Sequence, residues 1–154
     1  MTDRAPENAR NPYIIVKDVV RAVGSVAALH LEKIPAKKIA VTGSVGKTTT
    51  KNFIAAALSE CMSVHFSKGN RNNELGLPLS ALGASESDDA VVLEMGMRGF
   101  HEIEYLCSIA PPDIAVITNI GISHIELLGS RENILKAKSE ITDALRPDGV
   151  AVLN

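Results

Sequence analysis

The residues best suited to chemistry stand in the segment 39–50, IAVTGSVGKTTT, where an apolar run gives way to a glycine loop, a lysine and three threonines. Glycines let backbone N–H groups surround phosphate oxygens, and a following helix directs its positive end at them. In such a loop Lys47 reaches the terminal phosphates of a nucleotide, and the Thr48 hydroxyl joins the Mg²⁺ shell. Gly43 and Gly46 enclose two residues, fewer than the four of the usual phosphate loop. The segment predicts nucleotide binding, and a fortuitous strand, turn and helix is the alternative.

Other polar residues stand at or soon after the ends of predicted strands. Glu94 ends the apolar run 89–95, while Asn119 and His124 follow the run 114–118. Ligands of open α/β sheets bind beyond the carboxyl ends of the strands, so we expect these side chains near the glycine loop. A carboxylate there suits Mg²⁺, which favours oxygen ligands, although Glu94 could also cap a helix or pair with a lysine. His124 is either a structural histidine or a member of the same site.

Lys138 lies on the apolar face of the helix predicted over residues 131–145. At about 100° per residue, that face also holds Ile134, Ala137, Ile141, Ala144 and Leu145, whereas Lys136 points the opposite way. A lysine on a core-facing stripe must extend to solvent, find a partner or lose its charge. Lys138 therefore either reaches solvent or is directed into the nucleotide site.

Three asparagines, Asn70, Asn72 and Asn73, stand in the polar segment that follows the second predicted strand. Asparagine and glycine together often mark turns and nothing more. Side-chain amides near the start of a helix also suit an oxyanion or a phosphate-bearing substrate. The residues alone leave both interpretations open.

The composition bounds the class of protein. A length of 154 residues suffices for one domain with a core, and a formal net charge of −2 argues against broad nucleic-acid binding. No apolar run approaches the roughly 20 residues of a membrane span, and the N-terminus has no apolar signal core. We expect Cys61 and Cys107 to be two buried thiols in a reducing compartment. A cytoplasmic protein that binds neither nucleic acid nor membrane is expected.

Short apolar runs alternate with helical patterns along the chain. The predicted strands are 38–42, 62–66, 89–95, 114–118 and 149–153, and the predicted helices are 15–31, from the glycine loop to 60, 75–82, 103–109 and 131–145. This alternation predicts an α/β fold with a mostly parallel sheet and flanking helices. Residues 1–12 are expected to be a tail or linker, and the stop directly after the last strand is what a truncated domain would show.

Four segments together resemble the central ATPase domain of the Mur ligase family. They are 42–51 (TGSVGKTTTK), 69–78 (GNRNNELGLP), 94–97 (EMGM) and 113–126 (DIAVITNIGISHIE). The resemblance covers residues 13–154 and implies a P-loop NTPase-like domain, in which the short glycine spacing is the normal form. Within the family, the chain is most similar to the branch that adds D-alanyl-D-alanine to a UDP-N-acetylmuramoyl-tripeptide.

The resemblance implies a role for each matching residue. The ATP phosphates would be cradled by Gly43, Ser44, Val45, Gly46, Lys47, Thr48 and Thr49. Thr48 and Glu94 would bind Mg²⁺, His124 resembles the ligand of a second Mg²⁺, and Lys138 matches a lysine that is carbamylated, and so metal-associating, in related ligases. Asn70, Asn72 and Asn73 resemble the loop that faces the UDP-substrate.

The implied reaction is ATP-driven amide formation, with Lys47, His124 and Lys138 as the catalytic residues. The γ-phosphoryl group moves to the substrate carboxylate, and the amine of D-alanyl-D-alanine then displaces phosphate from the acyl phosphate. The N-terminal and C-terminal domains of the family are not represented in these residues, so the chain alone is not expected to complete the reaction.

Two alternatives stay open at this point. The first is a stand-alone nucleotide-binding module without ligase activity. The second is a ligase like folylpolyglutamate synthase, which shares the general architecture.

Overall fold

A single parallel sheet organises the molecule. The computed structural model describes residues 1–5, 7 and 11–154. Its strands are β1 (Lys37–Thr42), β2 (Val64–Phe66), β3 (Ala90–Glu94), β4 (Ile114–Ile117) and β5 (Val150–Leu153). They lie in the order β2-β3-β1-β4-β5, and every neighbouring pair is parallel. The predicted α/β fold with a parallel sheet is therefore confirmed.

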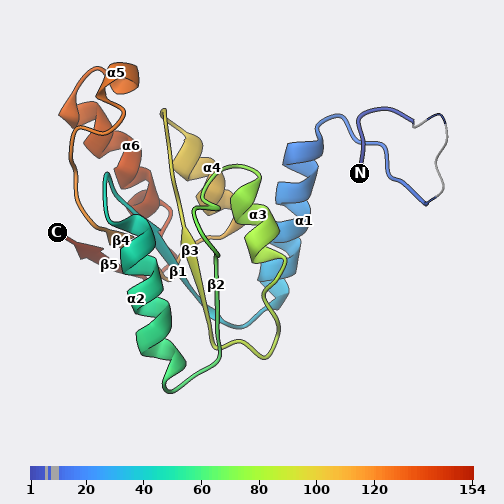
Figure 1. The fold of residues 1–154 in the computed structure, drawn as a ribbon, viewed down its shortest axis with the longest axis horizontal. Coiled ribbons are helices and arrows are strands. Elements are labelled where there is room, and N and C mark those ends of the chain that lie inside the picture. The colour runs from blue at the N-terminus through green and yellow to red at the C-terminus, as the bar shows by residue number, and fades with distance from the viewer. Residues whose placement is uncertain (6, 8–10) are drawn as a thin grey trace.

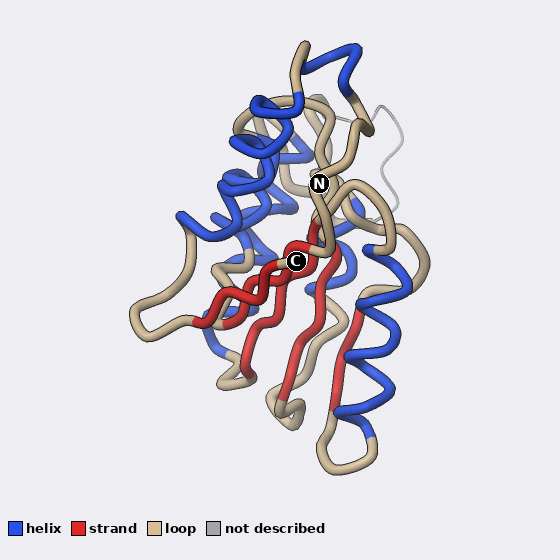
Figure 2. Tube along the Cα trace, turned by 90° about the vertical axis from the view of Figure 1, so that its left-hand side faces the viewer, coloured by secondary structure: helices blue, strands red, loops and turns tan. Residues whose placement is uncertain are grey.

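Helices cover both faces of the sheet, but unequally. They are α1 (Val19–Lys33), α2 (Lys47–Ser59), α3 (Gly76–Ala81), α4 (Glu102–Ile109), α5 (Ile125–Leu128) and α6 (Arg131–Asp143). Figure 1 and Figure 2 show α2 on one side of the sheet and α1, α3, α4 and α6 on the other. The larger core cluster lies on the side of these four helices, and a smaller one lies under α2.

The central strands are buried because helices pack on both of their faces. Every residue of β3 is buried, as its uninterrupted apolar run predicts, and so are five of the six residues of β1. The edge strand β5 is exposed along its whole length. Polar side chains that emerge at the carboxyl ends of β1 and β3 are thus attached to the buried centre of the sheet.

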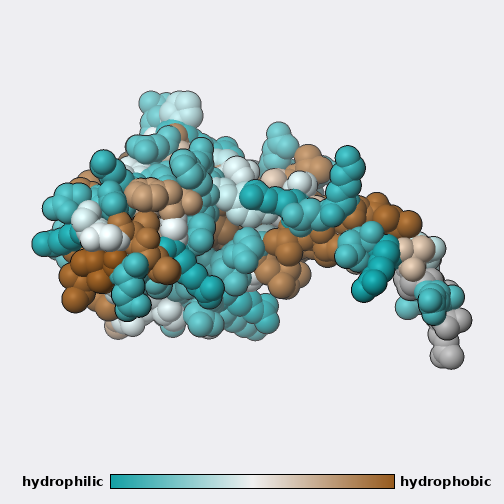
Figure 3. Space-filling view, turned by 90° about the horizontal axis from the view of Figure 1, so that it is seen from above, coloured by the Kyte–Doolittle hydropathy of each residue, from teal (hydrophilic) through white to brown (hydrophobic). Residues whose placement is uncertain are grey.

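The first helix begins later than its apolar spacing predicts. The Asp18 side chain accepts a hydrogen bond from the N–H of Arg21 at 2.9 Å and caps α1, which excludes residues 15–18 from the helix. Ile15 instead forms an isolated bridge with Thr2. Apolar side chains gather on the segment before α1 (Figure 3), where Tyr13, Ile14 and Ile15 are exposed. Residues 6 and 8–10 of the predicted tail 1–12 lie outside the described residues.

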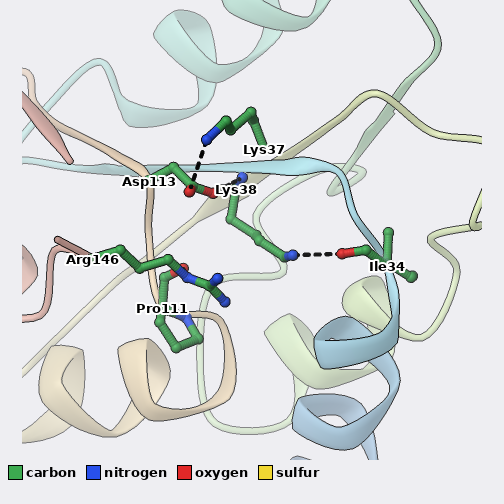
Figure 4. A network of polar contacts seen from close by, with 6 residues as sticks. All are labelled: Ile34, Lys37, Lys38, Pro111, Asp113 and Arg146. Carbon is green, nitrogen blue, oxygen red and sulfur yellow. Dashed lines mark hydrogen bonds and ion pairs between the residues drawn. The ribbon is translucent and has the colours of Figure 1, made fainter. Parts of the chain in front are cut away.

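A polar network ties together the amino ends of β1 and β4, at the end of the sheet away from the glycine loop (Figure 4). The Asp113 carboxylate accepts from the Lys38 backbone N–H at 2.8 Å and pairs with Lys37 Nζ at 3.4 Å. Nζ of the buried Lys38 donates to the carbonyl of Ile34, the C-cap of α1, at 2.7 Å. A cation at a helix C-terminus is favourable, so this lysine fixes α1 against the sheet.

One of the two cysteine predictions is wrong. Cys107 is buried in the main core, but Cys61 is exposed, because it stands in the turn that follows α2. Neither thiol forms a disulfide in the described part of the chain. None of the helices formed by the described residues is both long and apolar enough to span a bilayer.

Candidate functional site

The glycine loop connects β1 to α2, and two of its positions require glycine. Gly46 is the N-cap of α2 and adopts the left-handed conformation, with φ of 82°. Gly43 has φ of 148°, and a Cβ at this position would lie 1.9 Å from Oγ1 of Thr118. The close approach between loop and β4 explains why a side chain is not accommodated there.

Asn119 latches the loop from the end of β4. Its side-chain amide exchanges two hydrogen bonds with the Val45 peptide, accepting from N–H and donating to C=O, both at 3.1 Å. Its backbone carbonyl accepts from the Ser44 N–H at 3.1 Å. The N–H groups of Ser44 and Val45 are therefore occupied. Those of residues 46–49, at the N-terminus of α2, have no intrahelical partner and are the donors that can meet a phosphate.

Lys47 is the first residue of α2, and its ammonium folds back onto the glycine loop. Its Nζ donates to the Gly43 carbonyl at 2.8 Å, which holds a positive charge beside the helix N-terminus. Ser44 is buried, and its hydroxyl accepts from the N–H of Gly121 at 2.9 Å. Thr49 lies in the first turn of α2. The loop thus gathers backbone donors and one cation at a single position.

Thr48 and Glu94 meet at the carboxyl ends of β1 and β3. The Thr48 hydroxyl donates to Oε2 of Glu94 at 2.7 Å, and the Glu94 side chain is only 1% exposed. A carboxylate and a hydroxyl are the hard oxygen donors that Mg²⁺ prefers, so this donor set fits Mg²⁺. Among the described residues no group of three or more His, Cys, Asp or Glu side chains could hold a metal ion. The pair of Thr48 and Glu94 therefore fits an ion that completes its coordination shell with water and phosphate oxygens.

The asparagine loop divides between two roles. Asn72 donates to Oε1 of Glu94 at 2.8 Å, which places it beside the carboxylate. The Asn73 side chain accepts from the N–H of Gly76 at 2.8 Å, a turn contact at the start of α3. Asn70, Asn72 and Asn73 also line a cavity of about 520 Å³ together with Lys47 and His124. Asn73 therefore acts in a turn, while a role of the loop toward a substrate stays a prediction.

His124 lines this cavity together with the asparagine loop. It is exposed, has φ of 67°, and is the N-cap of the short helix α5, which the sequence pattern did not indicate. Its side chain makes no capping hydrogen bond. The imidazole is thus available to a ligand in the cavity, as a core histidine would not be.

Lys138 is buried in the core-facing stripe of α6, as the helical pattern predicts, and its side chain does not extend to solvent. Its exposure is 2%, whereas Lys136 is exposed. Desolvation by burial, and secondarily the nearby charge of Lys47, lowers the pKa of Lys138 to about 8. The amine is still mostly protonated at neutral pH, but its neutral form is far more populated than in an ordinary lysine.

One residue of this site, Lys51, does not follow from the sequence analysis; it is fully buried next to Glu94. Asn119 lies at the glycine loop, as its position after the fourth predicted strand leads us to expect, but its paired hydrogen bonds with Val45 were not predicted. A signal for Lys51 exists, because it shares one helical face with Ile54, Ala55 and Leu58, which is the argument that identified Lys138. No comparable signal exists for the paired hydrogen bonds of Asn119, which depend on how β4 meets the loop.

Fold and site together define an α/β domain with a short glycine loop of the phosphate-binding type and an adjacent acidic residue. Residues 41–154 match the Mur ligase middle domain. The chain belongs to the Mur ligase family. Ligases of the MurF type are among its relatives. Over 147 residues the chain is 48% identical to the UDP-N-acetylmuramoyl-tripeptide--D-alanyl-D-alanine ligase of Bacillus subtilis, covering 96% of this chain and 32% of that protein.

Solved structures agree with this placement. A crystal structure of MurF from Acinetobacter baumannii matches with a TM-score of 0.92 and 38% identity, covering 98% of this chain and 33% of that one. MurF ligase from Thermotoga maritima in complex with ADP matches with a TM-score of 0.89 and 37% identity, covering 98% and 35%. Escherichia coli FolC, at 22% identity and a TM-score of 0.58, shares the fold alone. The chain spans about a third of the length of the curated relatives it matches.

Proposed function

We propose that this chain supplies the ATP and Mg²⁺ site of a ligase that joins D-alanyl-D-alanine to a UDP-N-acetylmuramoyl-tripeptide, a step of peptidoglycan precursor synthesis. The observation that carries the proposal is the contact between Thr48 and Glu94 beside the glycine loop. The 48% identity to the Bacillus subtilis ligase supports the choice of substrates. Residues 13–154 would then be part of the central domain, with the other family domains supplied by further sequence.

The glycine loop would hold the phosphates of ATP. The N–H groups of residues 46–49 and the positive end of α2 would face the phosphate oxygens, while Asn119 keeps the loop in shape. Lys47 would leave the Gly43 carbonyl and donate to the γ-phosphoryl group, where it offsets the charge that develops during transfer. This arrangement stabilises the transferring group mainly by position and charge.

Thr48 and Glu94 would hold Mg²⁺, and His124 and Lys138 would serve a second ion. Bound Mg²⁺ offsets negative charge on the phosphates. The lowered pKa of Lys138, about 8, favours the neutral amine that carbamylation requires. His124 would meet its ligand from the cavity that it shares with Lys47.

The same cavity would receive the acceptor carboxylate. Asn70 and Asn72 line it together with His124, so their amides could donate to the substrate. The carboxylate would attack the γ-phosphoryl group to give an acyl phosphate and ADP. The amine of D-alanyl-D-alanine would then displace phosphate and form the amide. A cytoplasmic location, where ATP is available and both thiols stay reduced, fits this function.

A chimera tests the proposal. Residues 1–154 replace the matching segment of the Bacillus subtilis ligase, and the product is measured by mass spectrometry after incubation with ATP and both substrates. We expect the amide-linked product, only when D-alanyl-D-alanine is present. A folded chimera that hydrolyses ATP without forming this product would instead support a nucleotide-binding module without ligase activity.

A further inference from the structure

Lys51 is a fully buried lysine in the second turn of α2, with exposure of 0%. Its Nζ donates to the Gly69 carbonyl at 2.7 Å and lies 3.9 Å from Oε2 of Glu94. Lys51 therefore joins the glycine-loop helix, the start of the asparagine loop and the buried carboxylate. None of the roles proposed above uses it.

Burying this ammonium is costly, and its surroundings show what offsets the cost. Burial lowers the pKa of Lys51, and the charge of Glu94 opposes that effect. Buried ion pairs often contribute little net stability, since desolvation offsets their attraction. A methionine would fill a similar volume without that cost. We therefore look for a role of the pair between Lys51 and Glu94 other than stabilising the fold.

The groups around Glu94 show how its charge is balanced. Oε2 accepts from Thr48 and lies near Lys51, while Oε1 accepts from Asn72. The hydroxyl of Ser67 meets only the backbone N–H of Glu94. Lys51 is thus the one cation paired with this carboxylate among the described residues. A divalent cation that binds Glu94 and Thr48 would meet a positive charge already in place.

We propose that Lys51 is a positioning residue whose ammonium balances Glu94 in the metal-free chain and thereby makes tight binding of a divalent cation depend on nucleotide phosphate. Without nucleotide, the ammonium repels a second cation at Glu94. With nucleotide, the phosphate charges offset that repulsion. The bond to Gly69 meanwhile keeps the asparagine loop, and Asn72 with it, against the carboxylate. This inference rests on the metal site of the proposed function.

Binding of Mn²⁺, a spectroscopic substitute for Mg²⁺, tests the inference. Free Mn²⁺ is measured by electron paramagnetic resonance with the chain alone and with the chain plus ADP. Lys51→Met and Lys51→Gln both remove the charge, and the glutamine keeps an N–H donor for Gly69. We expect both variants to bind Mn²⁺ without ADP about fivefold more tightly than the unmodified chain, and the gain in affinity on adding ADP to shrink.

Two controls separate charge from shape. Lys51→Arg keeps the charge and is expected to bind Mn²⁺ within about twofold of the unmodified chain. Lys136→Met removes an exposed lysine from α6 and is expected to change nothing. If Lys51→Met does not fold without metal, we expect Mn²⁺ to restore its folding. We also expect the double variant Lys51→Met/Glu94→Gln to fold without metal. If neither Mn²⁺ nor the second substitution restores folding, the inference is contradicted.

The outcomes distinguish this inference from the proposed function. If the unmodified chain binds no Mn²⁺ even with ADP, the proposed metal site is wrong, and the inference about Lys51 is wrong as well. If the unmodified chain binds Mn²⁺ with ADP, but folded Lys51→Met and Lys51→Gln bind Mn²⁺ alone no more tightly, only the role of Lys51 is overturned.

Discussion

The Thr48 hydroxyl donates a hydrogen bond of 2.7 Å to Oε2 of Glu94, and this contact joins the first turn of α2 to the end of β3. The two residues are far apart in sequence, yet β1 and β3 are neighbours in the parallel sheet, so their carboxyl ends meet. The contact unites a hydroxyl and a carboxylate next to the phosphate loop. It is the feature from which the proposed metal and nucleotide site follows.

Removing either partner of this contact should weaken metal binding in the presence of nucleotide. We expect Glu94→Gln and Thr48→Val to lower the Mn²⁺ affinity of the chain with ADP by about tenfold or more, since the first replaces a charged oxygen ligand with a neutral amide and the second removes the hydroxyl oxygen. Thr48→Ser keeps the hydroxyl and should stay within about threefold. Equal Mn²⁺ affinity in Thr48→Val and Thr48→Ser would show that the hydroxyl does not bind the ion.

Substitution of the loop glycine Gly43 should cost more stability than substitution of a glycine with open surroundings. Gly129→Ala places a side chain at φ of 79° with nothing within 4 Å, so we expect a loss of about 1 kcal/mol from backbone strain alone. Gly43→Ala also drives a Cβ into Thr118, so we expect a loss of roughly 2–4 kcal/mol. Urea unfolding of both variants measures the difference. Equal losses would contradict the close approach of loop and β4.

The buried lysine of α6 should make stability depend on pH. The pKa of Lys138 falls from 10.5 to about 8 on folding, so below pH 8 both states are protonated and the folded state bears the cost of desolvation. We expect Lys138→Met to be more stable than the unmodified chain at pH 7, by on the order of 3 kcal/mol.

The advantage of Lys138→Met should shrink as pH rises from 8 toward 10.5, because there the unfolded state binds more protons and the unmodified chain gains stability. Urea unfolding at several pH values measures this, with Lys136→Met as the exposed control. A stability difference that stays constant over this range would show that Lys138 does not titrate with a lowered pKa.

The two thiols should differ strongly in reactivity. Cys61 is exposed, whereas burial, and to a lesser degree the charge of Glu140, raises the pKa of Cys107 to about 12. Because the thiolate is the reactive form, iodoacetamide at pH 8 should modify Cys61 and leave Cys107 intact until the chain is unfolded. Peptide mass spectrometry identifies the modified residue, and Cys61→Ser should abolish labelling of the folded chain. Rapid labelling of Cys107 would contradict its burial.

The strands and most helices could be predicted from sequence because the determinants are local. The apolar run that ends at Glu94 and the stripe that contains Lys138 both follow from the spacing of residues, and the structure buries both side chains. The first helix was predicted to begin too early, because its apolar spacing continues past the cap at Asp18. Helix α5 is a single turn, too short to show a period.

The parts of the site that could not be predicted depend on contacts between distant segments. The paired hydrogen bonds between Asn119 and Val45 require β4 to meet the loop at one register. Lys51 shares an apolar face within α2, yet only the fold brings Gly69 and Glu94 to its ammonium. The asparagine loop divides between a turn at Asn73 and a contact with Glu94 at Asn72, which composition alone does not distinguish.

Phosphate release by the Bacillus subtilis chimera tests the central claim most directly, because it reports on the phosphate site and the ligase reaction together. With ATP, UDP-N-acetylmuramoyl-tripeptide and D-alanyl-D-alanine, we predict steady release that Lys47→Met lowers by about a hundredfold or more and Lys136→Met leaves unchanged. Equal phosphate release by the folded chimera and its folded Lys47→Met variant would contradict the proposed role of the glycine loop in the ligase reaction.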